Sequence, residues 1–296
     1  MPKFNSDGEG NLAVLGIGLI LAANFLFSFI DTGSKWLALL GLPALQLAFV
    51  RYLGHLAISI GLAGTSGLSA DTFRCQDPFL VLLRAVFLTA STVLNFVALR
   101  HLPLSVTSTI LFSAPLLICA LSWPLLRERV GIYRWSAIIL GFCGVIIVIR
   151  PLGESFHWAM LLSLGAAFMF ALYSILTRKL ANRVSTDTQQ MYAGLVGTII
   201  LAPFALLQWQ SPTNSFQWLV LFSLGIFGWT GHQLLTNALR HAPANLLMPF
   251  GYSFIIYLTV WSYFVFDALP DFWTVIGALV IVVAGLIIWA RELQIK

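Results

Sequence analysis

Long apolar runs, separated by short polar breaks, fill almost the whole of this 296-residue chain. A helix that crosses the hydrocarbon core of a bilayer needs about 20 mostly apolar residues, and charged residues, proline and glycine mark where such runs end. The pattern therefore predicts an all-α membrane protein. Its ten predicted membrane-spanning helices are 12–38, 43–63, 78–99, 103–125, 133–149, 157–180, 187–208, 216–239, 243–265 and 271–290.

The chain also repeats itself. Residues 99–103 read LRHLP and residues 239–243 read LRHAP, 140 positions later, and each motif opens an apolar span. The segment LAANFLFSFIDTGSK (21–35) resembles GAAFMFALYSILTRK (165–179) at a shift of 144. These matches predict two five-helix halves, 1–150 and 151–296. Because five is odd, the halves must be inverted, as in alternating-access transporters that bind substrate near the membrane midplane.

Composition and charge agree with this interpretation. Hydrophobic residues make up 59% of the chain and charged residues only 9%, whereas soluble domains carry roughly 25% charged residues. If the N-terminus is cytoplasmic, eleven basic residues fall on the cytoplasmic side and three on the outer side. Cytoplasmic loops are enriched in Lys and Arg, so both termini are expected in the cytoplasm. The net charge of +5 then needs no nucleic-acid partner.

Polar side chains inside the spans form stripes along single helix faces. Such residues are costly in lipid and are expected to face the bundle interior or a water-filled cavity. The eighth span is the most polar, and it favours a cavity. The predicted substrate cavity comprises Asn24, Ser28, Arg84, Asn95, Ser113, Phe170, Tyr173, Trp229, His232, Gln233, Asn237, Tyr252 and Trp261. For the Ser and Thr positions and Asn24, hydrogen bonding between packed helices is the favoured alternative interpretation.

Two further pairs carry charge within the spans. Asp31 and Lys35 are spaced i,i+4, which suits an ion pair of structural or gating function near the outer end of the first helix. Arg51 and His55 share a face of the second span. They can form either a structural hydrogen-bonded pair or part of a substrate site.

Proline and small residues mark other spans. Pro115 and Pro249 lie inside the fourth and ninth spans, in opposite halves, and are expected to kink these helices. The fifth and tenth spans have no strongly polar stripe and predict a scaffold or a dimer surface. Their small residues are Ala137, Gly141, Gly144, Gly277, Ala284 and Gly285.

Motifs of catalysis and metal binding are missing from the sequence. No glycine-rich loop ending in Gly-Lys-Ser/Thr is present, so ATP hydrolysis is not expected, and neither a nucleophile elbow nor H-E-x-x-H occurs. Cys75, Cys119 and Cys143 form no C-x-x-C pair. We therefore expect no enzyme activity, no cofactor and no metal; the partners are a small-molecule substrate and the lipid bilayer.

The run LRHLPLSVTSTILFSAPLLICALSWPLLRERVGIYRWSAIILGFCGVIIVIRP (99–151) resembles the repeat unit of the drug/metabolite transporter superfamily, EamA type. In that unit one helix ends near ERV, and the next carries spaced glycines and ends near RP. Residues 239–291 show the unit in weaker form, with 267–270 in place of 127–130. The resemblance implies a central cavity lined mainly by the first, third, fourth, sixth, eighth and ninth helices.

This resemblance also implies a function. The chain is similar to bacterial exporters of amino acids, including aromatic ones, and a multi-pass place in the bacterial inner membrane follows. The leading hypothesis is a secondary transporter that exports amino acids or related small metabolites by alternating access. Multidrug or toxic-compound efflux and metabolite import by the same fold remain alternatives. An intramembrane enzyme is a distant one.

Overall fold

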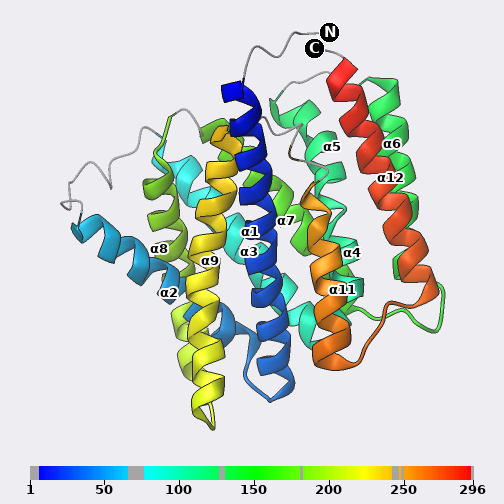
Figure 1. Cartoon of the computed structure of the whole chain (residues 1–296). Helices are drawn as coiled ribbons and strands as arrows, with labels where there is room; N and C mark the ends of the chain where they lie inside the picture. The colour runs from blue at the N-terminus through cyan, green and yellow to red at the C-terminus, as the bar shows by residue number, and fades with distance from the viewer. Residues whose placement is uncertain are drawn as a thin grey trace.

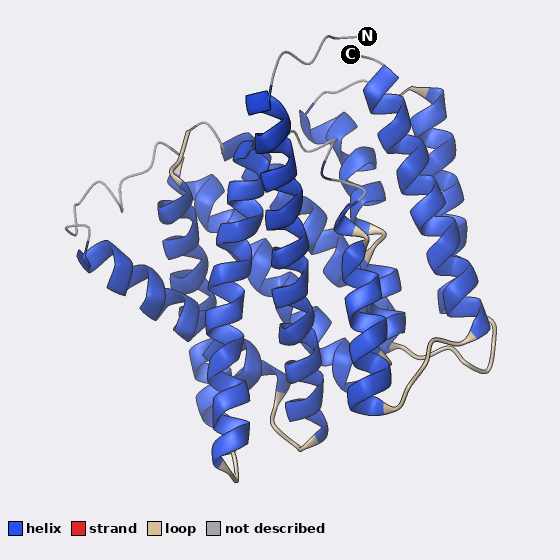
Figure 2. Ribbon diagram, viewed as in Figure 1, coloured by secondary structure: helices blue, strands red, loops and turns tan. Residues whose placement is uncertain are grey.

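The structure is a computed structural model of the chain, and it describes residues 7–65, 77–126, 131–180, 183–241, 247 and 250–294. Within these ranges the chain forms helices joined by short turns and loops (Figures 1 and 2). The helices are α1 (Asp7–Leu39), α2 (Ala44–Thr65), α3 (Pro78–His101), α4 (Leu104–Leu111), α5 (Ala114–Leu126), α6 (Ile132–Ile149), α7 (Ala159–Leu180), α8 (Thr186–Leu207), α9 (Ser215–His241), α11 (Ser253–Phe266) and α12 (Phe272–Gln294).

The ten-helix prediction is confirmed. In the described part of the chain, nine helical segments are long and apolar enough to cross a membrane, and α11 is a shorter apolar helix in the ninth predicted span. One of the nine, Leu104–Leu125, contains both α4 and α5. The turn between them lies at Phe112 and Ser113, and Pro115 falls in the first turn of α5. Proline is tolerated there because its missing N–H would have no helical partner.

The two halves pack reciprocally. Helix α1 packs along α9, and α7, the counterpart of α1 in the second half, packs along α3, the counterpart of α9. Helix α2 packs against α8, and α6 packs against α12, each with its own counterpart. In Figure 1, α1 begins at the end of the molecule where α12 ends, while the connection from α6 to α7 lies at the opposite end. The architecture is therefore a pair of inverted five-helix repeats.

Glycines allow close approach where the halves meet. A Cβ atom added to Gly225 on α9 would lie 2.8 Å from the Cα atom of Gly54 on α2. Similarly, a Cβ atom added to Gly277 on α12 would lie 2.7 Å from the carbonyl oxygen of Gly144 on α6. Small residues let helix backbones pack closely in membranes. The small residues of the fifth and tenth predicted spans thus contribute to packing within the chain.

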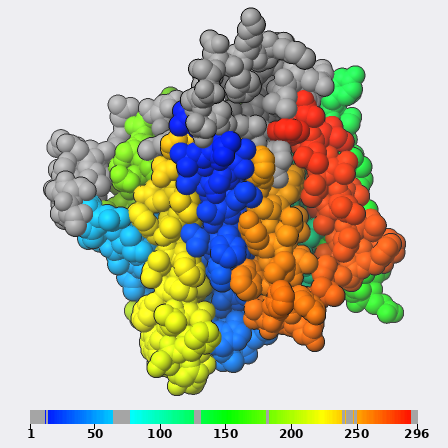
Figure 3. Space-filling view, in the orientation of Figure 1, coloured from blue at the N-terminus to red at the C-terminus, as the bar shows by residue number. Residues whose placement is uncertain are grey.

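The outside of the bundle is apolar. Large side chains such as Phe222, Ile226 and Leu279 are more than half exposed, and Figure 3 shows α1 between α9 and α11 on one face of the molecule. Charged side chains such as Asp31 and Arg51 are instead buried. Apolar residues outside and polar residues inside are the arrangement that lipid requires.

Candidate functional site: a central cavity

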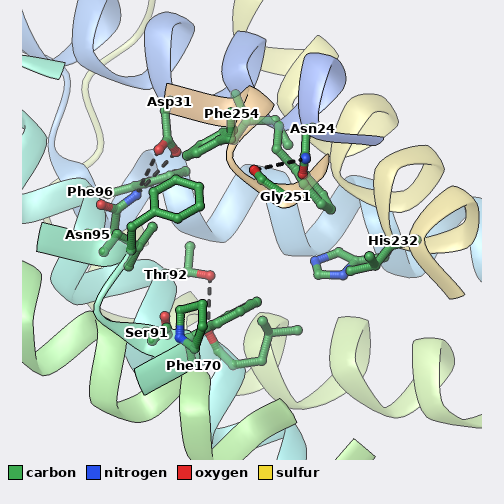
Figure 4. A pocket seen from close by; sticks show the side chains of 18 of the residues that line it. Asn24, Asp31, Ser91, Thr92, Asn95, Phe96, Phe170, His232, Gly251 and Phe254 are labelled. Carbon is green, nitrogen blue, oxygen red and sulfur yellow. Dashed lines mark hydrogen bonds between the residues drawn. The ribbon is translucent and has the colours of Figure 1, made fainter. Parts of the chain in front are cut away.

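A cavity of about 290 Å³ lies between the two halves. Its lining comes from α1, α3, α4, α5, α7, α9 and α11, with additional residues from α2 and from the segment preceding α11 (Figure 4). These include every helix that the family resemblance implies. Most of the wall is apolar, and it includes five phenylalanines, Phe27, Phe96, Phe112, Phe170 and Phe254. The polar side chains in the wall are Asn24, Asp31, Arg51, Ser91, Thr92, Asn95 and His232.

One side of the cavity carries a carboxylate. Asp31 on α1 is 7% exposed, and the Nδ2 atom of Asn95 on α3 donates to both of its oxygens, at 3.1 and 3.2 Å. Figure 4 shows the two side chains facing each other, with His232 on the opposite side of the cavity. The Oδ1 atom of Asn95 is buried without a hydrogen-bond partner. This side therefore presents a negative charge and a free acceptor.

Another part of the wall carries a guanidinium group. Arg51 on α2 is 6% exposed; it donates from one terminal nitrogen to Thr92 Oγ1 at 3.0 Å, and its other terminal nitrogen lies 3.3 Å from His232 Nε2. Arginine has no acceptor, so this imidazole nitrogen must accept and the ring is neutral, with its proton on Nδ1. The Nε atom of Arg51 is buried without a partner.

The Thr92 hydroxyl orients Arg51. Its single proton is donated to the Leu88 carbonyl at 3.0 Å, so its two lone pairs are left for other donors. Arg51 uses one, and the Tyr52 hydroxyl, 2.9 Å away, uses the other. The Arg51 guanidinium also lies over the Tyr52 ring, 5.1 Å from its centroid. The proton and both lone pairs of the Thr92 hydroxyl therefore all have partners, and the hydroxyl fixes the position of the Arg51 guanidinium group.

Asn24 connects α1 to the broken ninth span. Its Nδ2 atom donates to the carbonyl oxygens of Phe250 and Gly251, both at 3.2 Å, and lies 3.1 Å from the Ser253 hydroxyl. The contact with Gly251 is drawn in Figure 4. Unpaired carbonyls inside a membrane are tolerated only where protein or a polar cavity satisfies them. Asn24 meets this need at the start of α11.

The structure brings only part of the predicted set into the cavity. Of the predicted substrate-cavity residues, Asn24, Asn95, Phe170 and His232 line it. Asp31 and Pro115, which the sequence singled out for other reasons, line it too. The remaining predicted residues have other surroundings.

Arg84 and Tyr173 form a separate structural cluster. Arg84 on α3 donates from Nε to Thr177 at 2.7 Å, from one terminal nitrogen to the Gln189 carbonyl at 3.1 Å, and from the other to the Tyr173 hydroxyl at 3.0 Å. Each of its three nitrogens thus has a partner on α7 or α8. The cluster joins α3, α7 and α8, and Arg84 does not line the cavity.

Ser28 and Trp261 bind each other outside the cavity lining. Trp261 Nε1 donates to Ser28 Oγ at 3.1 Å, and Ser28 donates to the Phe25 carbonyl at 2.6 Å. The Trp261 ring also packs against Phe29, with centroids 4.7 Å apart. These contacts attach α11 to α1.

Five other predicted residues lie around the cavity rather than in its wall. Gln233 is half-buried on α9 and donates weakly to Asp187 on α8, at 3.4 Å. Tyr252 packs on Phe112, with centroids 5.3 Å apart, and its hydroxyl lies directly over Gly285. The others are Ser113, buried in the turn before α5, and the half-buried α9 residues Trp229 and Asn237.

The expected ion pair between Asp31 and Lys35 is replaced by separate contacts. Lys35 Nζ donates to the carbonyl oxygens of Leu99 and Leu102, at the C-terminal end of α3. The last carbonyls of a helix lack helical partners and carry partial negative charge, so they compete successfully for the ammonium group. Pro249, the other predicted kink, lies outside the described residues.

Arg51, Ser91, Thr92 and most of the apolar wall are among the lining residues that the sequence did not assign to the cavity. The shared face of Arg51 and His55 was a signal, but it fitted a structural pair equally well. Thr92 lies next to the Ser91–Asn95 stripe on α3 and resembles any other helix-packing threonine. In a chain that is 14% aromatic, no pattern distinguishes a cavity phenylalanine from a lipid-facing one.

The described residues contain no group of three or more His, Cys, Asp or Glu side chains close enough to hold a metal ion. The charged and polar groups of the cavity wall are few, mostly buried and hydrogen-bonded, and pockets for small organic molecules have this composition.

Comparison with known proteins agrees with this architecture. The sequence profile described as "EamA-like transporter family" matches residues 14–150 and again 157–290. The chain is 28% identical over 267 residues to the riboflavin transporter of Vibrio cholerae, covering 90% of this chain and 89% of that protein. It is 29% identical to an S-adenosylmethionine uptake transporter of Rickettsia bellii, covering 94% of each. It is 26% identical to the pseudopaline exporter CntI of Pseudomonas aeruginosa, covering 91% of this chain and 94% of that protein.

A solved structure described only as "Crystal structure of protein" superposes with a TM-score of 0.66 at 20% identity, covering 96% of this chain and 99% of the other. It supports the fold alone. The relatives that match along nearly the full chain are named as transporters and not as enzymes. The chain belongs to the EamA-like transporter family, and it is a multi-pass bacterial membrane transporter.

Proposed function

We propose that this protein is a secondary transporter that exports amino acids or related small metabolites by alternating access through the central cavity. The observation that carries the proposal is the cavity itself. It lies between two inverted repeats, with an apolar, phenylalanine-rich wall and a few hydrogen-bonded polar groups. Rocking of one repeat against the other around such a site would expose it to each side of the membrane in turn.

The size of the cavity favours a small solute. Pockets for small organic ligands span roughly 300–1,000 Å³, and this cavity, at about 290 Å³, lies at the lower limit. A metabolite with one short side chain suits this volume better than a bulky drug does. S-adenosylmethionine, named for one relative, itself carries an amino-acid group.

The proposed topology has two halves, 1–150 and 151–296, with both termini in the cytoplasm. The excess of Lys and Arg in the segments on that side supports this orientation. We propose that the substrate contacts the residues singled out in the sequence that also line the cavity, namely Asn24, Asp31, Asn95, Phe170 and His232. To this proposed group we add Arg51 and Thr92, which line the cavity too.

Reconstitution tests this function. Purified protein in liposomes preloaded with labelled amino acids should release at least one of them faster than vesicles containing heat-denatured protein. No release above that control for any amino acid would contradict the proposal.

Metabolite import is a second candidate, because several relatives are named for uptake. Right-side-out and inverted membrane vesicles from producing cells would separate the two directions. Export predicts energy-dependent accumulation only in inverted vesicles, and import predicts it only in right-side-out vesicles. Riboflavin and S-adenosylmethionine belong in the solute panel beside the amino acids.

A further inference from the structure

We infer that the cavity selects a zwitterion and fixes its orientation, with the ammonium group of the solute at Asp31 and Asn95 and its carboxylate at Arg51. The inference rests on the proposed function, since it takes the cavity as the transport site. It adds the substrate class, solutes with one positive and one negative group on a short backbone, and it assigns a separate subsite to each charge.

The first argument is that neither cavity charge makes an ion pair with an opposite charge of the protein; Asp31 and Arg51 attract each other only at longer range. Among the described residues, the ion pairs that form join Arg150 to Asp271 and Arg183 to Asp77, and both lie outside the cavity. Within the cavity, Arg51 contacts a hydroxyl and a neutral imidazole, and Asp31 contacts an amide. A buried charge without an opposite partner is unfavourable. Each site is therefore suited to a ligand group of the opposite sign.

The second argument is that the atom without a hydrogen-bond partner is an acceptor at one charge and a donor at the other. Beside the carboxylate of Asp31, the free atom is an acceptor, Oδ1 of Asn95, which suits an ammonium donor. On Arg51 the free atom is a donor, Nε, which suits a carboxylate acceptor. A Cβ atom on Gly228 would lie 3.2 Å from this Nε, so glycine at this position lets α9 pack closely against that edge of the guanidinium group.

The third argument is spacing. Asn95, which binds Asp31, and Thr92, which binds Arg51, are three residues apart on α3. Three residues correspond to about 4.5 Å of helical rise, so the two residues of α3 that bind the charged groups lie about one turn apart. A single small molecule can bridge such a separation, as the ammonium and carboxylate groups of an amino acid do through one carbon atom.

The phenylalanines complete the subsites. Phe96 and Phe254 lie close to Asp31 and Asn95 in Figure 4, and Phe170 lies farther along the wall, near Ser91. An apolar or aromatic side chain of the solute would contact these rings while its two charges are bound. An amine without a carboxylate would leave Arg51 unneutralised, and an acid without an ammonium group would leave Asp31 unneutralised.

The test uses three related probes on the purified full-length protein. For the amino acid that is released fastest in the reconstitution panel, displacement of the labelled compound is measured with the unlabelled amino acid, with its decarboxylated amine and with its deaminated acid. Phenylalanine, phenethylamine and 3-phenylpropanoate form such a set. We expect each single-charge analogue to bind at least about tenfold more weakly than the amino acid, because each leaves buried groups unpaired.

Variants separate the two subsites. Arg51→Gln should weaken binding of the amino acid and of the acid while sparing the amine, and Asp31→Asn should weaken binding of the amino acid and of the amine while sparing the acid. Asp77→Asn and Arg183→Gln make the same chemical changes in an exposed ion pair and should keep the wild-type ranking of the probes.

The outcomes are distinct. If no amino acid is transported or bound, the proposed function fails. If an amino acid is transported but its amine and acid analogues compete as well as it does, zwitterion selection is wrong and the proposed function stands. This comparison needs only the wild-type protein, so it decides the question even if a variant does not fold.

Discussion

Arg51 and Arg84 are both buried arginines in the first half of the bundle, at 6% and 2% exposure, and they are bound in different ways. Arg84 has a hydrogen-bond partner for each of its three nitrogens, on two other helices. Arg51 has partners for its two terminal nitrogens, keeps a free Nε, and lines the cavity. The comparison teaches that burial alone does not mark a binding residue. We propose that a substrate-binding arginine is distinguished by its place in the cavity wall and by a guanidinium nitrogen that has no protein partner.

The arginine that has a partner at every nitrogen should matter most for stability. Arg84→Met removes three hydrogen bonds and leaves the Tyr173 hydroxyl and the Gln189 carbonyl without this donor. With membrane hydrogen bonds worth about 0.6–1.7 kcal/mol each, we expect a loss of about 2–4 kcal/mol in the free energy of unfolding. Thermal unfolding in detergent measures it, with the exposed Arg183→Gln as control. An unchanged unfolding midpoint would show that the cluster around Arg84 does not hold α3, α7 and α8 together.

Substitution of Arg51 should instead affect transport more than stability. Arg51→Met removes two hydrogen bonds, against three for Arg84→Met, and it removes a buried charge that makes no ion pair. We therefore expect the free energy of unfolding to fall by less than it does for Arg84→Met, by about 1 kcal/mol or less. Transport should nevertheless fall at least about tenfold, which corresponds to about 1.4 kcal/mol of lost substrate interaction. Unfolding and efflux are measured on the same preparation. A large loss of stability with normal transport per folded molecule would make Arg51 a structural residue like Arg84.

A smaller effect is expected from the residue that orients Arg51. Thr92→Val keeps the shape of the side chain but removes the oxygen that accepts from Arg51 and Tyr52. The loss of about 1 kcal/mol in positioning should reduce transport roughly three- to tenfold. Thr89→Val on the same helix is the matched control, because the Thr89 hydroxyl donates only within the helix, to the Ala85 carbonyl. Equal effects of the two substitutions would argue against a positioning role for Thr92.

The smallest effect should come from an arginine that is exposed as well as paired. Arg150 contacts Asp271, and their side chains are 27% and 44% exposed. Partial burial raises the pKa of Asp271, but hydrogen bonds from Thr274 and the Arg150 guanidinium outweigh it and hold this pKa below its usual value. The pair therefore contributes to stability at neutral pH, and the contribution is lost as the pH falls through the lowered pKa.

For Arg150→Gln we expect a loss of at most about 1 kcal/mol, because exposed ion pairs are screened by solvent. Unfolding midpoints of wild type and variant, compared at neutral and acidic pH and at low and high salt, measure it. The difference should shrink in acid and in high salt. A difference that persists under both conditions would mean that the arginine acts through packing rather than charge.

The helix count and the inverted repeat could be predicted from the sequence because both depend on local properties. Twenty consecutive apolar residues cost too much in water wherever they occur, and two matching segments at one shift specify a repeat whatever the packing. Asp31, Asn95 and His232, which lie on the polar stripes of the sequence, all line the cavity.

The level of each polar residue along the bundle and its hydrogen-bond partners could be determined only from the tertiary structure. Arg84 and Asn95 share a face of α3, yet eleven residues of helix separate them by about 16 Å, and different helices cross at the two levels. The sequence also paired Asp31 with Lys35 by spacing alone, and the end of α3 proved the better partner for the lysine. Periodicity determines which way a side chain points. Which neighbour it meets depends on how helices distant in sequence pack, and so the sequence could identify a transporter fold while only the packed bundle distinguished Arg51 from Arg84.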